Sequence, residues 1–505
     1  MSILKKMKEM SARTRTMNGA ITYETSGEAC LDLFAVGGGM RYRKDAELLR
    51  LFNRAYIENP DLAMKLLFYI RDIRGGMGER KSFRRILRHV AFVWPASAQK
   101  NVSYISEYGR WDDLLSLMGS PAQAEVVCVI REQLEKDLAA VERRENGEAD
   151  APVSLLAKWL PSDNASSAAT RGKAKVLADA LDLSLREYRK TLVRIRRQLS
   201  LAEVRLTQRR PEKIRYDAVP ARAMLKYRAA FQEKDADRYT AYLEDVEQGR
   251  AKMHADTLDP PEILRPYFAR YFSIYSGMRQ AEPAGGRTLE ALWKSLGGKN
   301  GSRNALCVVD TSGSMYWGRA GAPRPALLAQ ALGLYFAEHC EGPFRNHIVT
   351  FESQPHLLEL QGETLADRLR YLQSAPWGNS TNLSAVFDLV LDSAWEMKAS
   401  QEEMPAVLYI ISDMEFNAAF RRPNETVYED ARKQYAAYGY ELPAVVFHNV
   451  NAWQTQTPVR AHTKGAAMVS GSGVAAMASK YTKNTTPMSH MLEVLGSPRY
   501  RCIHA

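Results

Sequence analysis

Apolar residues recur at helical spacing through the first half of the chain. Between about Ala46 and Gly285 they fall three and four positions apart, as in LLRLFNRAYIENPDLAMKLLFYIRDIR, and turn signals such as Asn59-Pro60 separate the runs. The alternation typical of strands is nearly absent there. Helices of this length joined by short loops predict an array of antiparallel pairs, although no clean sequence period marks a repeat. We expect an all-α, HEAT-like helical-repeat region over residues 1–290.

A second pattern begins after the glycine clusters between Ala281 and Ser302. Short apolar runs (ALCVVD, NHIVTF, AVLYIIS, PAVVFHNV) then alternate with amphipathic segments such as PALLAQALGLYFAEHC and LSAVFDLVLDSAWEM. Buried strands separated by helices predict a parallel sheet covered on both faces. The chain is therefore expected to be multidomain, with a doubly wound, Rossmann-like α/β domain over residues 300–505. In such sheets ligands bind beyond the carboxyl ends of the strands.

The composition is that of a folded protein, with 46% hydrophobic and 25% charged residues among 505. No apolar run of about 18 residues is present to span a bilayer, and the basic start MSILKKMKEMSARTRT lacks the apolar core of a secretory signal. The five cysteines are scattered and form no Cys-x-x-Cys motif. We expect a cytoplasmic, monomeric protein without membrane contact, disulfides or zinc.

The net charge of +11 is divided unevenly along the chain. Residues 1–300 contain 52 Lys and Arg against 39 Asp and Glu, a net of +13, whereas residues 301–505 contain 17 against 19, a net of −2. A basic region of this size suits a polyanionic partner, because phosphate contacts supply most non-specific nucleic-acid affinity. A solvated basic face on a long helical region explains the same charge equally well.

Oxygen donors follow several of the expected strands. Asp310, Ser312 and Ser314 come directly after the strand ALCVVD, Thr381 lies in the loop WGNSTN, and Asp413 follows the strand AVLYIIS. Because the carboxyl ends of parallel strands share one edge of a sheet, these loops should converge there. Magnesium prefers hard oxygen ligands and retains several waters, so a few carboxylates and hydroxyls suffice to hold it. The sequence predicts a divalent-cation site, with Mg²⁺ the expected ion and Mn²⁺ an alternative.

This order of motifs resembles the metal-ion-dependent adhesion site (MIDAS) of von Willebrand factor A domains. The resemblance implies that Asp310, Ser312 and Ser314 form the first motif, Thr381 the second and Asp413 the third, and that an acidic group of a partner protein completes the metal's coordination. The sequence departs from the commonest pattern after the third motif, where Ser-Asp-Met-Glu stands in place of Asp-Gly. A polar turn capping a helix would also explain DTSGS alone. The agreement of three loops favours the cation site.

The order of the two regions, helical and then von Willebrand A-like, resembles the TROVE family of Ro RNA-binding proteins. More closely, the stretches RDIRGGMGERKSFRRIL, YGRWDDLLSL, LLAKWLPSDN, LREYRKTLVRIRRQLS and VPARAMLKYR are similar to a bacterial, phage and plant branch with a TROVE-like region joined to this domain. The resemblance implies a helical ring closed by the α/β domain, a non-coding RNA partner and a ribonucleoprotein assembly.

Two basic stripes are the candidate RNA-binding residues. Their members fall three and four positions apart, or next to one another, and so share a face of each helix: Lys81, Arg84, Arg85 and Arg88 on one helix, and Arg186, Lys190, Arg194 and Arg197 on another. Unopposed like charges repel and are tolerated more readily beside a polyanion, and Arg suits bidentate phosphate contact. Pairing with Glu and Asp from adjacent helices is the alternative. For the aromatic residues nearby, Phe68, Tyr69, Trp111 and Tyr188, we expect buried packing in preference to base stacking.

Two functional hypotheses remain, and neither is enzymatic. The first is an RNA-binding protein of Ro type with a cation site for a partner's carboxylate; the second is a protein-interaction adaptor with the same cation site and no nucleic acid. The chain contains no G-x-x-x-x-G-K-[ST] motif, and SGSG around Ser472 lacks the spacing of a G-x-S-x-G nucleophile turn. Glu415 is the one carboxylate beside the cation motifs that could act as a base, and we expect it to be a solvated surface residue.

Overall fold

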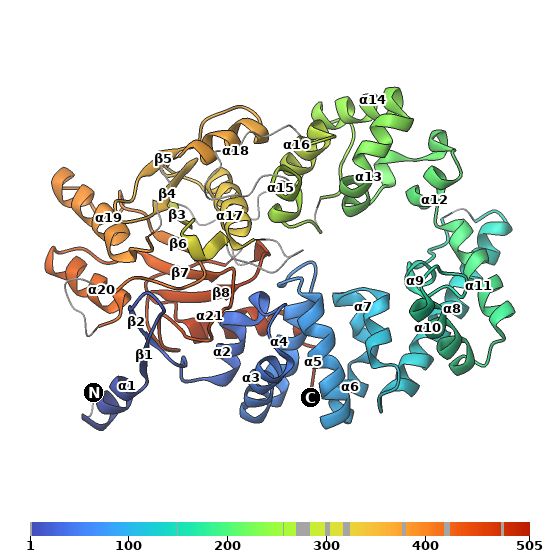
Figure 1. Cartoon of the computed structure of the whole chain (residues 1–505), viewed down its shortest axis with the longest axis horizontal. Helices are drawn as coiled ribbons and strands as arrows, with labels where there is room; N and C mark the ends of the chain where they lie inside the picture. Colours follow the sequence, from blue (N-terminus) through green and yellow to red (C-terminus); the bar gives the residue numbers. More distant parts are fainter. Residues whose placement is uncertain are drawn as a thin grey trace.

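The computed structural model describes residues 3–148, 150–255, 257–268, 283–297, 304–316, 324–375, 380–418, 425–475 and 479–505. The first part is mostly helical and the second is built on a six-stranded mixed sheet (Figure 1). The expected change from helical to α/β architecture is therefore confirmed. None of the helices in these ranges combines the length and the apolar character needed to cross a membrane.

The helices of the first region follow one another with short connections. They are α1 (Ile3–Ser11), α2 (Ala29–Val36), α3 (Asp45–Glu58), α4 (Pro60–Arg71), α5 (Arg80–Val93), α6 (Pro95–Lys100), α7 (Ile105–Tyr108), α8 (Gln123–Glu145), α9 (Leu156–Trp159), α10 (Ala168–Ala180), α11 (Leu185–Gln198), α12 (Ala202–Thr207), α13 (Ala221–Lys234), α14 (Ala236–Glu247), α15 (Pro260–Phe268) and α16 (Gly286–Lys294). Local sequence sets many of their starts. Asn59 accepts a hydrogen bond from the N–H of Leu62 at 3.0 Å ahead of α4, and Ser184 forms a capping box with Glu187 at α11.

These helices form an arc that begins and ends on the α/β domain (Figure 1). Consecutive members pack on one another, as α3, α4 and α5 do, and α8 packs on α11 before the group of α13, α14 and α16. Packing each helix mainly on its neighbours buries apolar faces that no single helix can bury alone. The arc is thus a series of local contacts.

The start of the arc is joined to the α/β domain by α2. This helix packs against strand β8 (Ala466–Ser470) and helix α21 (Pro487–Leu495). The Ser470 hydroxyl accepts the N–H of Gly38 and donates to the Phe34 carbonyl, both at 3.0 Å. The C-terminal segment also returns to the helices, because Tyr500 donates its hydroxyl to Asp72 at 2.8 Å.

The far end of the arc meets the same domain on another side. Helix α15 packs on α17 (Pro325–His339) and α16 on α18 (Leu365–Ser374). The Trp293 indole donates to Glu338 at 2.8 Å, and Glu290 accepts the N–H of Leu365 at 2.7 Å. The helices and the α/β domain therefore form a closed circuit of contacts. The expected boundary at residue 290 falls inside α16.

The sheet has the strand order β5-β4-β3-β6-β7-β8. The strands are β3 (Ala305–Asp310), β4 (His347–Phe351), β5 (Leu357–Glu359), β6 (Val407–Ser412), β7 (Ala444–Asn449) and β8, and the remaining helices are α19 (Leu383–Met397) and α20 (Val427–Ala437). The four strands expected from the sequence are β3, β4, β6 and β7, and they pair in parallel. Strands β5 and β8 were not expected. Because β5 runs antiparallel to β4, the sheet is mixed and not purely parallel.

A short hairpin at the start of the chain belongs with the α/β domain. Strands β1 (Arg13–Arg15) and β2 (Ile21–Tyr23) pair antiparallel. The Thr16 hydroxyl donates to the Phe416 carbonyl at 2.6 Å, and the N–H of Tyr23 donates to the Thr457 carbonyl at 3.0 Å. The expectation of an all-α region over residues 1–290 is wrong for this hairpin, which is also hydrogen-bonded to residues of the α/β domain more than 350 positions away.

Candidate cation site and basic helices

Asp310 ends the central strand β3 and is fully buried. One of its carboxylate oxygens accepts the N–H of Ser312 at 2.8 Å, and the other accepts the hydroxyl of Ser412 at 2.5 Å. The chain then turns, so that the hydroxyl oxygens of Ser312 and Ser314 lie 3.2 Å apart. The first motif is therefore folded as one cluster of oxygen atoms at the carboxyl end of β3.

Asp413 reaches the same place from the neighbouring strand. It follows β6, which pairs in parallel with β3, and its side chain is 2% exposed. One carboxylate oxygen, Oδ1, accepts the N–H of Glu415 at 3.2 Å. The other, Oδ2, is buried and makes no hydrogen bond to any described residue. A buried carboxylate oxygen without a donor is costly, because it loses water and gains nothing in return.

Burial makes the ionised form of both carboxylates unfavourable. Burial, and then the charge of Asp413, raise the pKa of Asp310 to about 7. Burial also raises the pKa of Asp413, and the nearby Ser314 side chain opposes that rise. Two buried like charges are stable together only when a proton or a cation neutralises part of their charge. This arrangement fits a bound divalent cation, for which carboxylate and hydroxyl oxygens are suitable ligands.

Thr381, the expected second motif, lies beside this cluster. Its hydroxyl is 2.7 Å from the Glu415 carbonyl and 3.0 Å from the Asn417 side-chain oxygen, and it accepts the side-chain N–H of Asn18 at 3.1 Å. No hydrogen bond among the described residues joins Thr381 to Asp310 or Ser312. The structure thus unites Asp310, Ser312, Ser314 and Asp413 and places Thr381 next to the segment that follows Asp413. Residues 377–379 of the same loop lie outside the described ranges.

Glu415 is not the solvated residue expected from the sequence. Its side chain is 4% exposed, and its carboxylate accepts the N–H of Met17 at 2.7 Å from the tip of the N-terminal hairpin. Burial raises its pKa, the Met17 N–H lowers it, and the charge of Asp413 raises it again. Asn18 and Met17 were missed as neighbours of the site because no local pattern links them to a loop almost 400 residues later.

The donor set of the site is therefore rich in hydroxyls. In the described ranges, no group of three or more His, Cys, Asp and Glu side chains is arranged to hold a metal ion. Asp310 and Asp413 supply carboxylates, and Ser312 and Ser314 supply hydroxyls. A divalent cation held by two carboxylates and neutral donors keeps the ability to bind a further anionic ligand.

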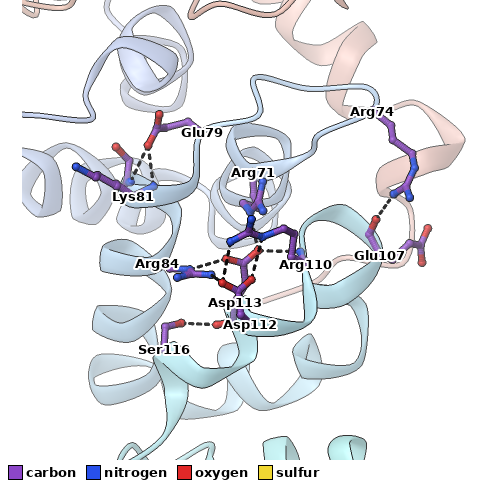
Figure 2. Close-up of polar contacts among 11 residues, drawn as sticks. Arg71, Arg74, Glu79, Lys81, Arg84, Glu107, Arg110, Asp112, Asp113 and Ser116 are labelled. Carbon is purple, nitrogen blue, oxygen red and sulfur yellow. Dashed lines mark hydrogen bonds and ion pairs between the residues drawn. The ribbon is translucent and has the colours of Figure 1, made fainter. Parts of the chain in front are cut away.

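The basic stripe of α5 does not stand free of counter-charges. Arg84 lies 2.5 Å from Asp113 and 2.8 Å from Asp112, and Figure 2 shows Arg71 and Arg110 directed at the same two carboxylates. Asp113 is fully buried and Arg71 is 2% exposed. Of the two alternatives for Arg84, the structure shows the pairing with carboxylates of an adjacent segment, because Arg84 belongs to an ion-pair network around the buried Asp113.

The other members of this stripe differ among themselves. Arg85 pairs with Asp45, and Arg88 donates to the carbonyls of Ser116 and Met118, both at 3.1 Å. Lys81 is exposed, and its ammonium group lies 4.9 Å from the centre of the Tyr42 ring. Lys81 is the one residue of the four whose side chain forms neither an ion pair nor a hydrogen bond within the described ranges.

The basic stripe on α11 has fewer of its cations paired with carboxylates or carbonyls than the stripe on α5. Arg194 lies 2.7 Å from Glu145 and 3.5 Å from Glu142, so it is paired. Arg186, Lys190 and Arg197 are exposed and have no ion pair among the described residues. Helices α5 and α11 occupy different parts of the arc (Figure 1). The two stripes are therefore separate surfaces and not one platform.

The aromatic residues near the stripes serve packing, as expected. Phe68, Tyr69 and Tyr188 are buried, and Trp111 is partly buried against the core. The Tyr188 hydroxyl donates to the Pro161 carbonyl at 2.8 Å. None of these rings is placed to stack on a nucleic-acid base.

The fold and the donor set define a class of protein, namely a helical arc closed by an α/β domain with a hydroxyl-rich candidate cation site. Residues 16–132 and 166–298 match the family model described as a domain of unknown function, DUF2828, and residues 304–486 match another, DUF7788. The chain is 28% identical over 515 residues to "Uncharacterized protein L728" of Acanthamoeba polyphaga mimivirus. The alignment covers 95% of this chain and 86% of that protein. Among solved structures, the Ro (RSR) protein of Deinococcus radiodurans is similar with 17% identity and a TM-score of 0.37, covering 94% of this chain and all of that one.

Proposed function

We propose that this chain is a non-enzymatic binding protein that holds RNA on its helical arc and a divalent cation in its α/β domain. The observation that supports the cation is the buried Oδ2 oxygen of Asp413, which makes no hydrogen bond to a described residue and lies near a second buried carboxylate, that of Asp310. Asp310, Ser312, Ser314 and Asp413 would hold the ion, with Mg²⁺ the preferred species. When bound, the ion supplies positive charge that a carboxylate of a partner protein can approach.

The cation is tested by thermal unfolding of the full chain with and without magnesium. A ligand that binds only the folded state stabilises it by about 2.7 kcal/mol at a hundred times its Kd. Magnesium should therefore raise the unfolding temperature of the wild type and leave Asp310→Asn unchanged. Asp392→Asn removes an exposed carboxylate on α19 and is the matched control, which should respond like the wild type. An equal response in Asp310→Asn would contradict the site.

The RNA half of the proposal is supported by the charge division and by the exposed cations that remain unpaired. Residues 1–300 have a net charge of +13. Lys81, Arg186, Lys190 and Arg197 project into solvent from this region without an ion pair in the described ranges. Cations that are not committed to internal carboxylates are free to neutralise phosphates.

A charge-reversal experiment tests this surface. Changing Lys81, Arg186, Lys190 and Arg197 together to Glu should weaken RNA binding at least a hundredfold and flatten its salt dependence, by about 0.7 log units of slope for each phosphate contact with a single strand that is lost. The matched control reverses four exposed cations of the α/β domain, namely Lys398, Lys464, Lys480 and Arg501, for the same change in net charge. Equal RNA binding by both variants would contradict the assignment of the helical arc.

A protein-interaction adaptor without nucleic acid is the second candidate. The pairing of Arg84, Arg85 and Arg194 with carboxylates favours it, because these side chains are then explained by the stability of the helices alone. Sequencing of RNA recovered with the purified full chain at low salt separates the two. Recovery of a defined RNA supports the first candidate, and an empty recovery supports the adaptor.

A further inference from the structure

A cavity of about 200 Å³ lies at the joint between the start of the helical arc and the α/β domain. Residues 38–47 form one wall, and the loops after β7 and β8 form another, with Asn451 and Trp453 on the first of them. The first turn of α17, at Pro325 and Leu328, closes the remaining side. The cavity thus lies beyond the carboxyl ends of two parallel strands, where ligands of α/β sheets bind, but at different strands from the cation site.

The walls of this cavity favour an anion. Helices α3 and α17 both begin at its edge, and no side chain of a described residue caps either N-terminus, although Asp45 and Glu47 in the first turn of α3 offset part of its dipole. Uncapped N–H groups and the helix dipole attract negative charge. Lys44, directly before α3, is exposed and has no ion pair in the described part of the chain. Arg43 has a buried Nε atom that makes no hydrogen bond, although it lies 3.3 Å from Glu47.

The acidic residues of the cavity do not cancel this charge. Glu79 is fully occupied, because one oxygen accepts the N–H groups of Lys81 and Ser82 and the other accepts Arg41 at 2.7 Å. Glu47 faces Arg43 as described above. With Arg41 neutralised by Glu79 and Arg43 by Glu47, the charge of Lys44 and the N-terminus of α17, whose first turn contains no acidic residue, remain. The cavity is therefore electropositive.

Two aromatic rings and a side-chain amide complete the lining. The Trp453 side chain is 43% exposed, and the Lys81 ammonium lies 4.9 Å from the centre of the Tyr42 ring. The side-chain amide nitrogen of Asn451 is buried and makes no hydrogen bond to a described residue. An aromatic face and an amide donor are the groups that recognise a nucleobase by stacking and by its edge.

We propose that this cavity binds a single nucleotide, with its phosphate near Lys44 and the ends of α3 and α17 and its base against Trp453 and the amide of Asn451. The cavity, at about 200 Å³, is smaller than the roughly 300–1,000 Å³ of pockets for drug-sized ligands, so it admits at most one nucleotide unit and no oligonucleotide. The unit is either a free nucleotide or the phosphorylated end of an RNA strand. The inference goes beyond the proposed function, because it requires neither the cation nor the exposed cations of α11.

Equilibrium dialysis of the full chain tests the cavity. The probes are the four ribonucleoside 5′-monophosphates, inorganic phosphate, and a five-nucleotide RNA with and without a terminal phosphate. The wild type should bind at least one monophosphate or the phosphorylated RNA saturably, with one site per chain. Lys44→Glu and Trp453→Ala should each weaken that binding at least fivefold, since a stacked base and a paired phosphate both contribute. Lys175→Glu and Trp395→Ala alter another exposed lysine and another exposed tryptophan away from the cavity and should bind like the wild type.

The outcomes distinguish a free nucleotide from the end of an RNA strand, and failure of this cavity from failure of the RNA-binding surface. Binding of a monophosphate alone supports a free nucleotide as occupant, and binding of the phosphorylated RNA alone supports a strand end. Three outcomes overturn the proposal. The first is that no probe binds saturably, and the second is that Lys44→Glu and Trp453→Ala bind as well as the controls. The third is that inorganic phosphate binds as tightly as any nucleotide. A variant in which only the three cations of α11 are reversed, Arg186, Lys190 and Arg197, should still bind the nucleotide, so failure of the RNA surface leaves this result intact.

Discussion

Replacing Asp113 by Ala should destabilise the protein severely, because it removes the centre of the network in Figure 2. The Asp113 carboxylate accepts hydrogen bonds from Arg71 at 2.8 Å, from Arg84 at 2.5 Å and from the N–H of Arg110 at 2.9 Å. The Arg71 side chain is 2% exposed, so removal of Asp113 leaves a buried guanidinium without its carboxylate partner. Breaking a buried ion pair by removing one partner costs about 3–5 kcal/mol, mostly through the charge left behind.

Urea unfolding followed by circular dichroism measures this cost. Asp113→Ala should lower the free energy of unfolding by about 3–5 kcal/mol, and Asp113→Asn, which keeps an acceptor but no charge, should cost less. Asp182→Ala is the control, because its ion pair with Arg131 lies at the surface with Asp182 81% exposed. A surface pair contributes about 0–1 kcal/mol. If Asp113→Ala lost no more stability than Asp182→Ala, the network would not be the structural element described here, and Arg84 would again be a candidate for RNA contact.

Two further predictions concern the joint between the helices and the α/β domain. Burial lowers the pKa of His490 to about 4, below its ordinary value of 6.5, so the stability that its neutral form contributes is complete above pH 6.5 and is lost as the pH falls towards 4. Between pH 7 and pH 4, the free energy of unfolding of the wild type should therefore fall by about 2–3 kcal/mol more than that of His490→Gln. His462 is exposed, so His462→Gln should follow the wild type. Gly38→Ala should lower the free energy of unfolding by about 1–3 kcal/mol, because the new Cβ would lie 2.6 Å from the Cα of Gly471. The control is Gly172→Ala in α10, where the new Cβ meets open space. It should leave the free energy of unfolding unchanged or raise it by up to about 1 kcal/mol in the same urea titration.

The parts of this fold that the sequence predicted are those with strong local signals. Strands β3, β6 and β7 are fully buried runs of apolar residues, and Asp310, Ser312 and Ser314 follow the first of them directly. The position of a residue at the carboxyl end of a parallel strand fixes its neighbours across the sheet, so the approach of Asp413 to Asp310 could also be predicted. Strand β8 was missed because its five residues are flanked by small and polar ones without a clear pattern.

The rest depended on contacts between distant residues. Arg84 lies 29 positions from Asp113, Arg85 lies 40 positions from Asp45, and Glu415 lies 398 positions from Met17. Helical periodicity identifies the face on which an arginine lies but not the carboxylate that faces it from another helix. The same limit hid the burial of Glu415, whose covering hairpin is at the opposite end of the chain.

The central claim is that Asp310, Ser312, Ser314 and Asp413 hold one divalent cation. The most direct test is to titrate Mn²⁺ into the full chain and to count the bound ions per chain by electron paramagnetic resonance of the free ion, with competition by Mg²⁺. The wild type and Glu415→Gln, which removes the adjacent buried carboxylate that is not a ligand, should each bind one ion that Mg²⁺ displaces. Asp413→Asn should bind none. Binding of one displaceable ion by Asp413→Asn, or its loss in Glu415→Gln alone, would contradict this account of the site.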